Sequence, residues 1–82
     1  MKAKVYISLK EGILDPQGKA VERALDSLGF SGVGGVRIGK YLELELADQS
    51  ADTASQSVEE MCEKLLANTV IETYRYELES GV

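Results

Sequence analysis

The sequence contains no histidine and a single cysteine among its 82 residues. Cys62 therefore cannot form an internal disulfide, and zinc sites of the usual kinds are excluded. The absence of histidine also removes the commonest general base of enzymes. The residue inventory therefore offers no visible catalytic machinery and no metal site.

Long apolar runs are also absent, since no stretch approaches the roughly 20 residues that a membrane-spanning helix requires. The N-terminal sequence MKAKVYISL alternates between apolar and polar residues as a strand does, and it lacks the cleavage site of a signal peptide. We therefore expect a cytoplasmic protein without a membrane partner.

Basic residues are in the minority. Fourteen acidic and nine basic residues give a net charge of −5, which repels phosphate backbones and argues against nucleic acid as a partner. A protein or a small molecule remains as the partner. The length predicts a single domain over residues 1–82 with one modest core, because a chain of this size buries only about 60 to 65% of its unfolded surface.

The first part of the chain predicts a strand followed by a helix. Residues 1–10 alternate between apolar and polar side chains, which is typical of a strand. Asp15 can cap a helix whose first position suits Pro16, because a first-turn N–H has no partner within the helix. Gly29 is a natural end for this helix. Its apolar residues recur at helical spacing: Ala20, Val21, Ala24, Leu25 and Leu28.

The central stretch VRIGKYLELEL, residues 36–46, predicts two strands joined at Gly39-Lys40. A two-residue turn there places Val36 and Ile38 on the face opposite the leucines of the second strand, with apolar patches on both faces. A three-residue loop over residues 39–41 places them on the same face as the leucines. The first register implies a partner, and the second implies one ordinary core face. The second strand alternates Leu42, Leu44 and Leu46 with Glu43 and Glu45.

The last part predicts a second helix and a final strand. Thr53-x-x-Gln56 or Ser57-x-x-Glu60 can form a capping box at the helix start, and Asn68 can end the helix in the left-handed conformation. Residues 73–79 alternate as a strand does. The helix has an apolar stripe formed by Val58, Met61, Cys62, Leu65 and Leu66.

The resulting order of strand, helix, strand, strand, helix, strand predicts an α+β fold of the ferredoxin-like βαββαβ type. We expect a four-stranded antiparallel sheet with both helices on one face. The other face would then be bare, and a bare apolar face usually marks an interface. Self-association is the simplest way to cover it. The residues expected to line that face are Tyr6, Val36, Ile38 and Tyr41.

The side chains that could act in catalysis are better explained by a structural role in the core or on the surface. Cys62 lies on the apolar stripe of the second helix, which predicts a buried, inert thiol. Glu43 and Glu45 share one side of a strand, and a solvated strand face explains them. For Arg37 and Lys40 we weigh an interface role against a plain surface role, because guanidinium groups suit contacts with carboxylates.

Three segments together carry a resemblance to a known family: LKEGILDPQGKAVERAL, VRIGKYLELEL and MCEKLLANTVIETYRYELE. They resemble the PurS family, the small subunit of the multi-subunit phosphoribosylformylglycinamidine synthase of purine biosynthesis. The resemblance implies a non-catalytic homodimer, or a higher oligomer, that bridges the large synthetase subunit and the glutaminase subunit. It also implies that this chain holds no cofactor of its own, while the complex uses ATP and Mg.

Set beside the family, the register with apolar residues on both sheet faces is favoured, because an obligate bridge needs a second apolar face. Two alternatives stay open: a free-standing sensor of small molecules on the same scaffold, similar to ACT domains, and an interaction module unrelated to purines. Two groups of residues are assigned to subunit contacts as hypotheses. The first, near the hairpin, is Arg37, Gly39, Lys40 and Tyr41; the second is Asp15, Pro16, Gln17, Gly18, Asn68, Thr69 and Arg75.

Overall fold

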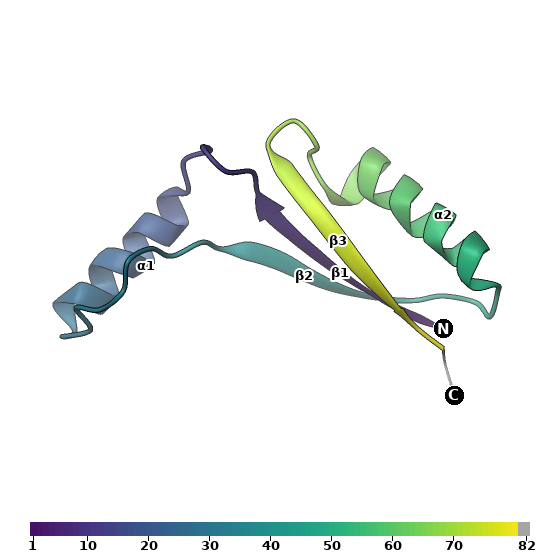
Figure 1. The fold of residues 1–82 in the computed structure, drawn as a ribbon, viewed down its shortest axis with the longest axis horizontal. Helices are drawn as coiled ribbons and strands as arrows, with labels where there is room; N and C mark the ends of the chain where they lie inside the picture. The colour runs from purple at the N-terminus through teal and green to yellow at the C-terminus, as the bar shows by residue number, and fades with distance from the viewer. Residues whose placement is uncertain (81–82) are drawn as a thin grey trace.

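The computed structural model describes residues 1–80, so the last two residues of the predicted domain lie outside the described range. The described chain forms one antiparallel sheet, two α-helices and a π-helical turn (Figure 1). This is an α+β fold, as predicted. The elements are β1 (Lys2–Leu9), α1 (Pro16–Ser27), β2 (Gly39–Glu45), α2 (Ala51–Met61), the π-helix η1 (Cys62–Leu66) and β3 (Glu72–Glu79).

The sheet of the described residues has three strands, not the four that the sequence predicted, in the order β2-β1-β3. β1 is the central strand and is antiparallel to both neighbours. Val5 lies between Leu42 on one side and Tyr76 on the other, and the same register continues along the sheet. The predicted first and last strands are therefore confirmed, and the strand that contains the three alternating leucines is β2.

The predicted hairpin at Gly39-Lys40 is wrong. The chain runs from Val36 through Ile38 without strand pairing and enters β2 at Gly39, which lies opposite Ser8 of β1. Gly39 serves a close approach rather than a turn, because a Cβ atom there would overlap the main-chain carbonyl oxygen of Ile7. Neither of the two hairpin registers applies, since both require a strand over residues 36–38.

The core lies between one face of the sheet and α2. The inward side chains of β1 are almost completely buried, with Val5 fully buried and Ile7 2% exposed. From the other layer come Val58 and Cys62, which lie one helical turn apart and are both fully buried. The buried position predicted for Cys62 is confirmed. The hydroxyl of Tyr76 on β3 donates a hydrogen bond to Glu59 of α2 at 2.7 Å.

The second helix begins earlier and ends differently than its sequence predicted. Ser50 is the cap, and its hydroxyl accepts a hydrogen bond from the backbone N–H of Thr53 at 3.2 Å. After Met61 the helix widens into the π-turn η1, which leaves Leu65 82% exposed while Leu66 packs against the core. Asn68 does not adopt the left-handed conformation, because no residue other than glycine has a positive φ within residues 1–80.

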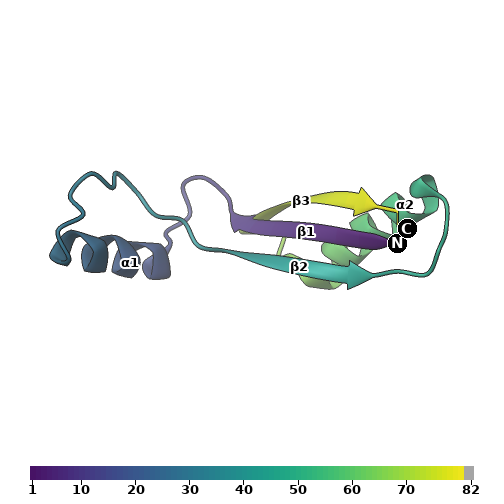
Figure 2. The ribbon, with the colours of Figure 1, turned by 90° about the horizontal axis from the view of Figure 1, so that it is seen from below.

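The first helix does not lie on the sheet. Residues 11–38, which we call the arm, extend past the end of the sheet, and α1 forms the outer part of the arm (Figures 1 and 2). The prediction that both helices cover one face is therefore wrong for the single chain. The local signals of α1 are confirmed: Asp15 caps it with Pro16 at its start, and Gly29 follows its end with φ +95°. No helix of the described residues has the length and apolarity needed to span a membrane.

Candidate subunit interfaces

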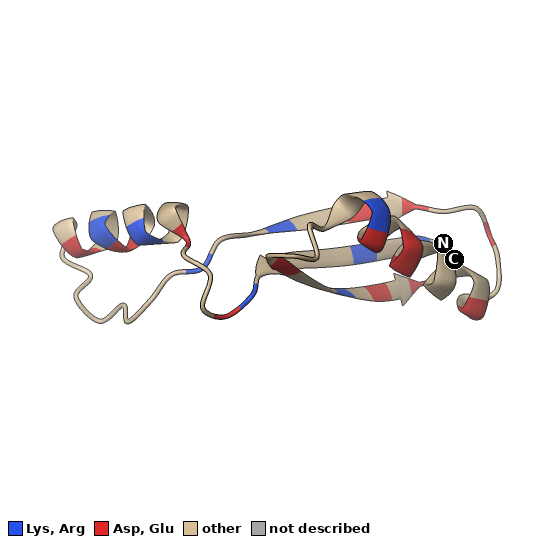
Figure 3. Cartoon of the chain, turned by 90° about the horizontal axis from the view of Figure 1, so that it is seen from above, with Lys and Arg blue, Asp and Glu red and all other residues tan. Residues whose placement is uncertain are grey.

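The sheet face that points away from α2, here called the open face, is covered by charged and aromatic side chains. Acidic and basic residues both occur on β2 and β3, whereas the charged residues of the central strand β1 are all lysines (Figure 3). The alternation of β1 places Lys2, Lys4 and Tyr6 on this face, because its other residues fill the core. The remaining members come from β2 and β3: Tyr41, Glu43, Glu45, Thr73, Arg75, Glu77 and Glu79.

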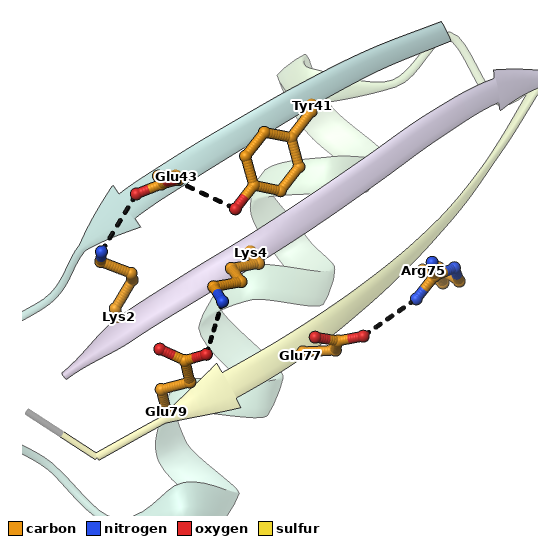
Figure 4. Close-up of polar contacts among 7 residues, drawn as sticks. All are labelled: Lys2, Lys4, Tyr41, Glu43, Arg75, Glu77 and Glu79. Atoms are coloured by element: carbon orange, nitrogen blue, oxygen red, sulfur yellow. Dashed lines mark hydrogen bonds and ion pairs between the residues drawn. The ribbon is translucent and has the colours of Figure 1, made fainter.

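Ion pairs join neighbouring strands across the open face (Figure 4). Lys2 on β1 lies 3.0 Å from Glu43 on β2, and Lys4 lies 2.6 Å from Glu79 on β3. The hydrogen bond and charge of Glu43 raise the pKa of Lys2, and the Lys2 hydrogen bond lowers the pKa of Glu43. Glu79 raises the pKa of Lys4 in the same way. Central lysines between acidic outer strands therefore give the open face charges of both signs.

An aromatic and cationic stack lies further along the same face. The rings of Tyr6 and Tyr41 are 5.1 Å apart, and the guanidinium carbon of Arg75 lies 3.9 Å from the centre of the Tyr6 ring. Such a contact combines stacking with a cation–π attraction. Arg75 also lies 3.1 Å from Glu77, and Tyr41 donates a hydrogen bond to Glu43 at 3.2 Å. Tyr41 remains 50% exposed, so this stack offers a partner both aromatic surface and charge.

This composition corrects the predicted apolar patch. Tyr6 and Tyr41 are on the open face as expected, but Val36 and Ile38 precede β2 and belong to the arm. Glu43 and Glu45 share the face, as predicted. The open face is therefore a polar surface, and the apolar surface available to a partner is elsewhere.

Most of the predicted interface residues meet at one end of the sheet, where the arm leaves it. Asp15 accepts hydrogen bonds there from the backbone N–H groups of Gly18 and Ile38, both at 2.8 Å. These two bonds, that of Ile38 first, lower the pKa of Asp15 below its ordinary value. Arg37 donates to the main-chain oxygens of Leu9 at 2.6 Å and Lys10 at 3.1 Å.

Other predicted residues surround this point. Lys40 lies 3.7 Å from Glu72, and a hollow of about 400 Å³ is lined by both of them together with Pro16 and Gln17. The turn that carries Asn68 and Thr69 is at the same end, because Lys10 donates to the carbonyl of Ile71 at 2.8 Å. Within this turn, the Asn68 side chain accepts a bond from the Val70 N–H, and the Asn68 N–H donates to Glu72.

Eight of the eleven predicted residues have partners or close contacts within the chain, and the contacts of Tyr41, Asn68 and Arg75 are those given above. Asp15 and Arg37 bind backbone, and Lys40 pairs with Glu72. Gly18 and Gly39 are close to backbone carbonyls. Replacing Arg37 and Lys40 together by alanine would consequently remove internal contacts as well as any interface. Exposed Pro16, Gln17, Tyr41, Asn68 and Arg75, with half-buried Thr69, are the predicted residues available to a partner.

The arm carries the apolar surface that sequence reasoning missed. Leu28, a member of the predicted apolar stripe of α1, is 72% exposed. Leu14 and Phe30, which flank the helix outside that stripe, are 72% and 59% exposed. The stripe itself was visible in the sequence. Its partner was not, because the spacing of apolar residues says that a face is to be buried but not against which element.

No group of acidic, cysteine or histidine side chains within residues 1–80 is arranged to hold a metal ion. Burial raises the pKa of the Cys62 thiol, which lowers its reactivity as a nucleophile.

Comparison with known proteins identifies the family of this chain. The family model PurS, described as phosphoribosylformylglycinamidine (FGAM) synthase, matches residues 2–80. The chain belongs to the PurS family. A relative from Bacillus subtilis strain 168, the phosphoribosylformylglycinamidine synthase subunit PurS, is 60% identical over 99% of this chain and 95% of its own length. The protein of the same name from Methanocaldococcus jannaschii is 42% identical over 95% and 94%.

Solved PurS structures have the same fold. The C2 crystal form of Bacillus subtilis PurS matches with a TM-score of 0.80 and 61% identity, over 95% of this chain and 96% of that one. The structure of PurLQS from Thermotoga maritima matches with a TM-score of 0.85 and 30% identity, over 93% of each chain. Membership of the PurS family makes this chain a subunit of FGAM synthase, a ligase of purine biosynthesis, that is not catalytic alone. The free-standing sensor is therefore not favoured.

Proposed function

We propose that this PurS-family chain works as a homodimeric or larger bridge, in the cytoplasm, between the large ATP-dependent synthetase subunit and the glutaminase subunit. The single observation that carries the proposal is the arm, whose helix α1 lies away from the sheet and whose large apolar side chains Leu14, Leu28 and Phe30 are exposed. The similarity to the structure of PurLQS from Thermotoga maritima supports association with further subunits.

Bridging has a chemical purpose in a synthase that uses glutamine. Ammonia released into water at neutral pH is mostly protonated and is then no longer a nucleophile, so its release and its use need a sequestered connection. The reaction converts formylglycinamide ribonucleotide, glutamine, ATP and water to formylglycinamidine ribonucleotide, glutamate, ADP and phosphate. ATP and Mg belong to the large subunit in this proposal, and the present chain contributes contacts only.

The homodimer is supported by two incomplete surfaces that suit each other. The arm has an exposed apolar stripe, whereas the α2 side of the sheet is covered by one helix only. Leu42 and Leu44 on β2 are half-buried, although they face the core layer. A second copy that lays its arm beside α2 would bury both surfaces. It would also restore, between two chains, the arrangement of two helices on one sheet face that the sequence predicted.

The interface residues proposed for the other subunits are the exposed ones at the end of the sheet where the arm leaves it. Tyr41 and Arg75 offer an aromatic ring and a guanidinium group, which are the side-chain types most often found at the centre of protein interfaces. Pro16, Gln17 and Asn68 lie around the hollow and turn at the same end.

Reconstitution tests the bridge. The large and glutaminase subunits are mixed with and without this chain, and product formation is measured first with glutamine and then with ammonia as the nitrogen source. We expect the chain to increase the glutamine-dependent rate strongly and to leave the ammonia-dependent rate of the large subunit unchanged. An equally high glutamine-dependent rate without the chain would contradict the proposal.

A pair of neighbouring substitutions tests the homodimer. Leu28→Asp places a charge on the apolar side of the arm, whereas Ser27→Asp places the same charge one residue away on an exposed position. We expect sedimentation to show a smaller species for Leu28→Asp only, because a charge in an apolar interface must lose its water. If both variants sediment like the unsubstituted protein, the arm is not the dimer contact.

A further inference from the structure

Two chain segments connect the arm to the sheet, and side chains tie them to each other. Residues 10–15 lead out of β1 into α1, and residues 36–38 lead back into β2. Two unbraced segments of this length would leave the arm free to swing, because backbone without pairing has many accessible conformations. We call the place where the two segments meet the junction.

Asp15 uses both of its carboxylate oxygens at the junction. Oδ1 accepts from the Gly18 N–H and caps α1, while Oδ2 accepts from the Ile38 N–H on the returning segment. The first bond is an ordinary helix cap. The second has no role in starting the helix, since its donor lies 23 residues away in the sequence. Asp15 therefore joins the helix start directly to the entry of β2.

Arg37 makes the reverse connection. It lies on the returning segment and donates two bonds to the carbonyls of Leu9 and Lys10, where β1 ends and the outgoing segment begins. Both bonds are donated by one terminal nitrogen of the guanidinium group, Nη2, and they hold the returning segment against the end of β1.

Close backbone packing completes the junction. Gly18 is the only buried residue of α1, and a Cβ atom there would overlap the carbonyl oxygen of Val36. By contrast, Gly34 and Gly35, a few residues earlier in the arm, have open space at the same position. Within the arm, the tight fit at Gly18 thus lies at the point where the two segments meet.

We infer that Asp15 and Arg37 are positioning residues that fix the direction of the arm, so that the arms of two copies can reach each other's sheets. The inference rests on the proposed homodimer and explains why residues predicted as interface contacts have internal partners. They act on assembly through the arm, not by touching the second copy. An arm that points correctly for only part of the time lowers the apparent affinity by that fraction.

The substitution Asp15→Asn separates the two bonds of this side chain. Asparagine is a good helix cap but has one acceptor oxygen in place of two. When that oxygen caps α1 by accepting from the Gly18 N–H, the amide nitrogen faces the Ile38 N–H and cannot accept its bond. Asp26→Asn is the matched control, because Asp26 is an exposed carboxylate on α1 outside the junction. For the second positioning residue, Arg37→Gln is compared with Arg23→Gln, which removes an exposed guanidinium group from α1.

Two measurements on the full chain follow. Amide hydrogen exchange reports the Ile38 N–H, and sedimentation over a range of concentrations reports self-association, with circular dichroism as a check on helix content. For Asp15→Asn we expect unchanged helix content and Ile38 exchange faster by about tenfold or more. If the arm then points in the pairing direction in only about one molecule in ten, that fraction lowers the apparent affinity about tenfold for each copy. Because both copies of a dimer contribute an arm, self-association should weaken about a hundredfold. The control variants should match the unsubstituted chain.

Other results separate the possible failures. Unchanged Ile38 exchange in both junction variants would show that these side chains do not hold the junction and would overturn the inference. Faster exchange with unchanged self-association would also overturn it, because the arm direction would then not matter for pairing. If the unsubstituted chain is monomeric at all concentrations, the proposed homodimer fails, and the positioning role fails with it, even if the exchange result confirms the bracing itself.

Discussion

Truncating Val58 tests whether the core is built where the structure places it. Val58 is fully buried in α2, whereas Val70, in the turn before β3, is 79% exposed. Val58→Ala and Val70→Ala therefore make the same chemical change in opposite environments. The difference between them isolates the effect of burial.

The expected loss can be worked out from the atoms removed. Two carbon atoms leave the core at about 0.8 kcal/mol each, and the cavity that remains adds about 1 kcal/mol. Alanine has the higher helix propensity, which returns about 0.5 kcal/mol at a position inside α2. The net loss is about 2 kcal/mol. A domain of 82 residues has a free energy of unfolding of about 4 to 12 kcal/mol, so the change removes a substantial part of it.

Urea unfolding followed by circular dichroism measures this loss. With a denaturant slope of about 1 kcal/mol per molar, the midpoint of Val58→Ala should fall by about 2 M. Val70→Ala should stay within about 0.5 kcal/mol of the unsubstituted chain. All samples need the same protein concentration, because self-association adds stability that depends on it. Equal midpoints for the two variants would refute the assignment of the core.

Three further predictions concern backbone packing, pH and thiol reactivity. Gly39→Ala should destabilise the chain by about 1 to 3 kcal/mol in urea, because its Cβ would push β2 away from the Ile7 carbonyl; Gly34→Ala, with open space around it, should differ by less than about 0.5 kcal/mol, and equal effects would contradict the close approach. Asp15 has a folded-state pKa below its ordinary 3.8, so its stabilisation is complete above that pH and is lost as the pH falls through the folded-state pKa. The urea midpoint of the unsubstituted chain should therefore fall more steeply below pH 3.8 than that of Asp15→Asn, and parallel pH curves would argue against this. Cys62 is fully buried with a raised pKa, so it should react with an aromatic disulfide reagent only after unfolding in urea, and rapid reaction of the native chain would speak against its buried position.

Resemblance and local pattern gave correct predictions in different ways. The three quoted segments identified the family, which the comparisons confirm. Local pattern identified β1, the start of α1 and the burial of Cys62. Each of these features depends only on residues close together in the sequence. They are the alternation of side chains along a strand, the capping side chain that lies three residues before the N–H it binds at a helix start, and the apolar side of a helix.

The hairpin shows where local pattern stops. Residues 36–38 alternate as a strand would, and Gly39-Lys40 resembles a tight turn, yet the segment crosses the junction and only then enters β2. An extended segment becomes a strand only if another strand supplies its hydrogen bonds. Here the Ile38 N–H is satisfied by a carboxylate from the start of α1 instead. That choice depends on a residue 23 positions away and leaves no trace in the period of the segment itself.

The amino-acid sequence by itself thus determined the family, most of the helices and strands, and which side chains need burial. Only the tertiary structure decided what covers them. It placed α2 on the sheet and α1 on an arm. It also made the open face a polar surface with ion pairs between neighbouring strands, where the sequence predicted an apolar patch. It also gave Asp15 and Arg37, two of the predicted contact residues, hydrogen-bond partners on the backbone of the same chain. The physical reason is that periodicity records which face of an element is apolar, while the partner of that face is set by long-range contacts.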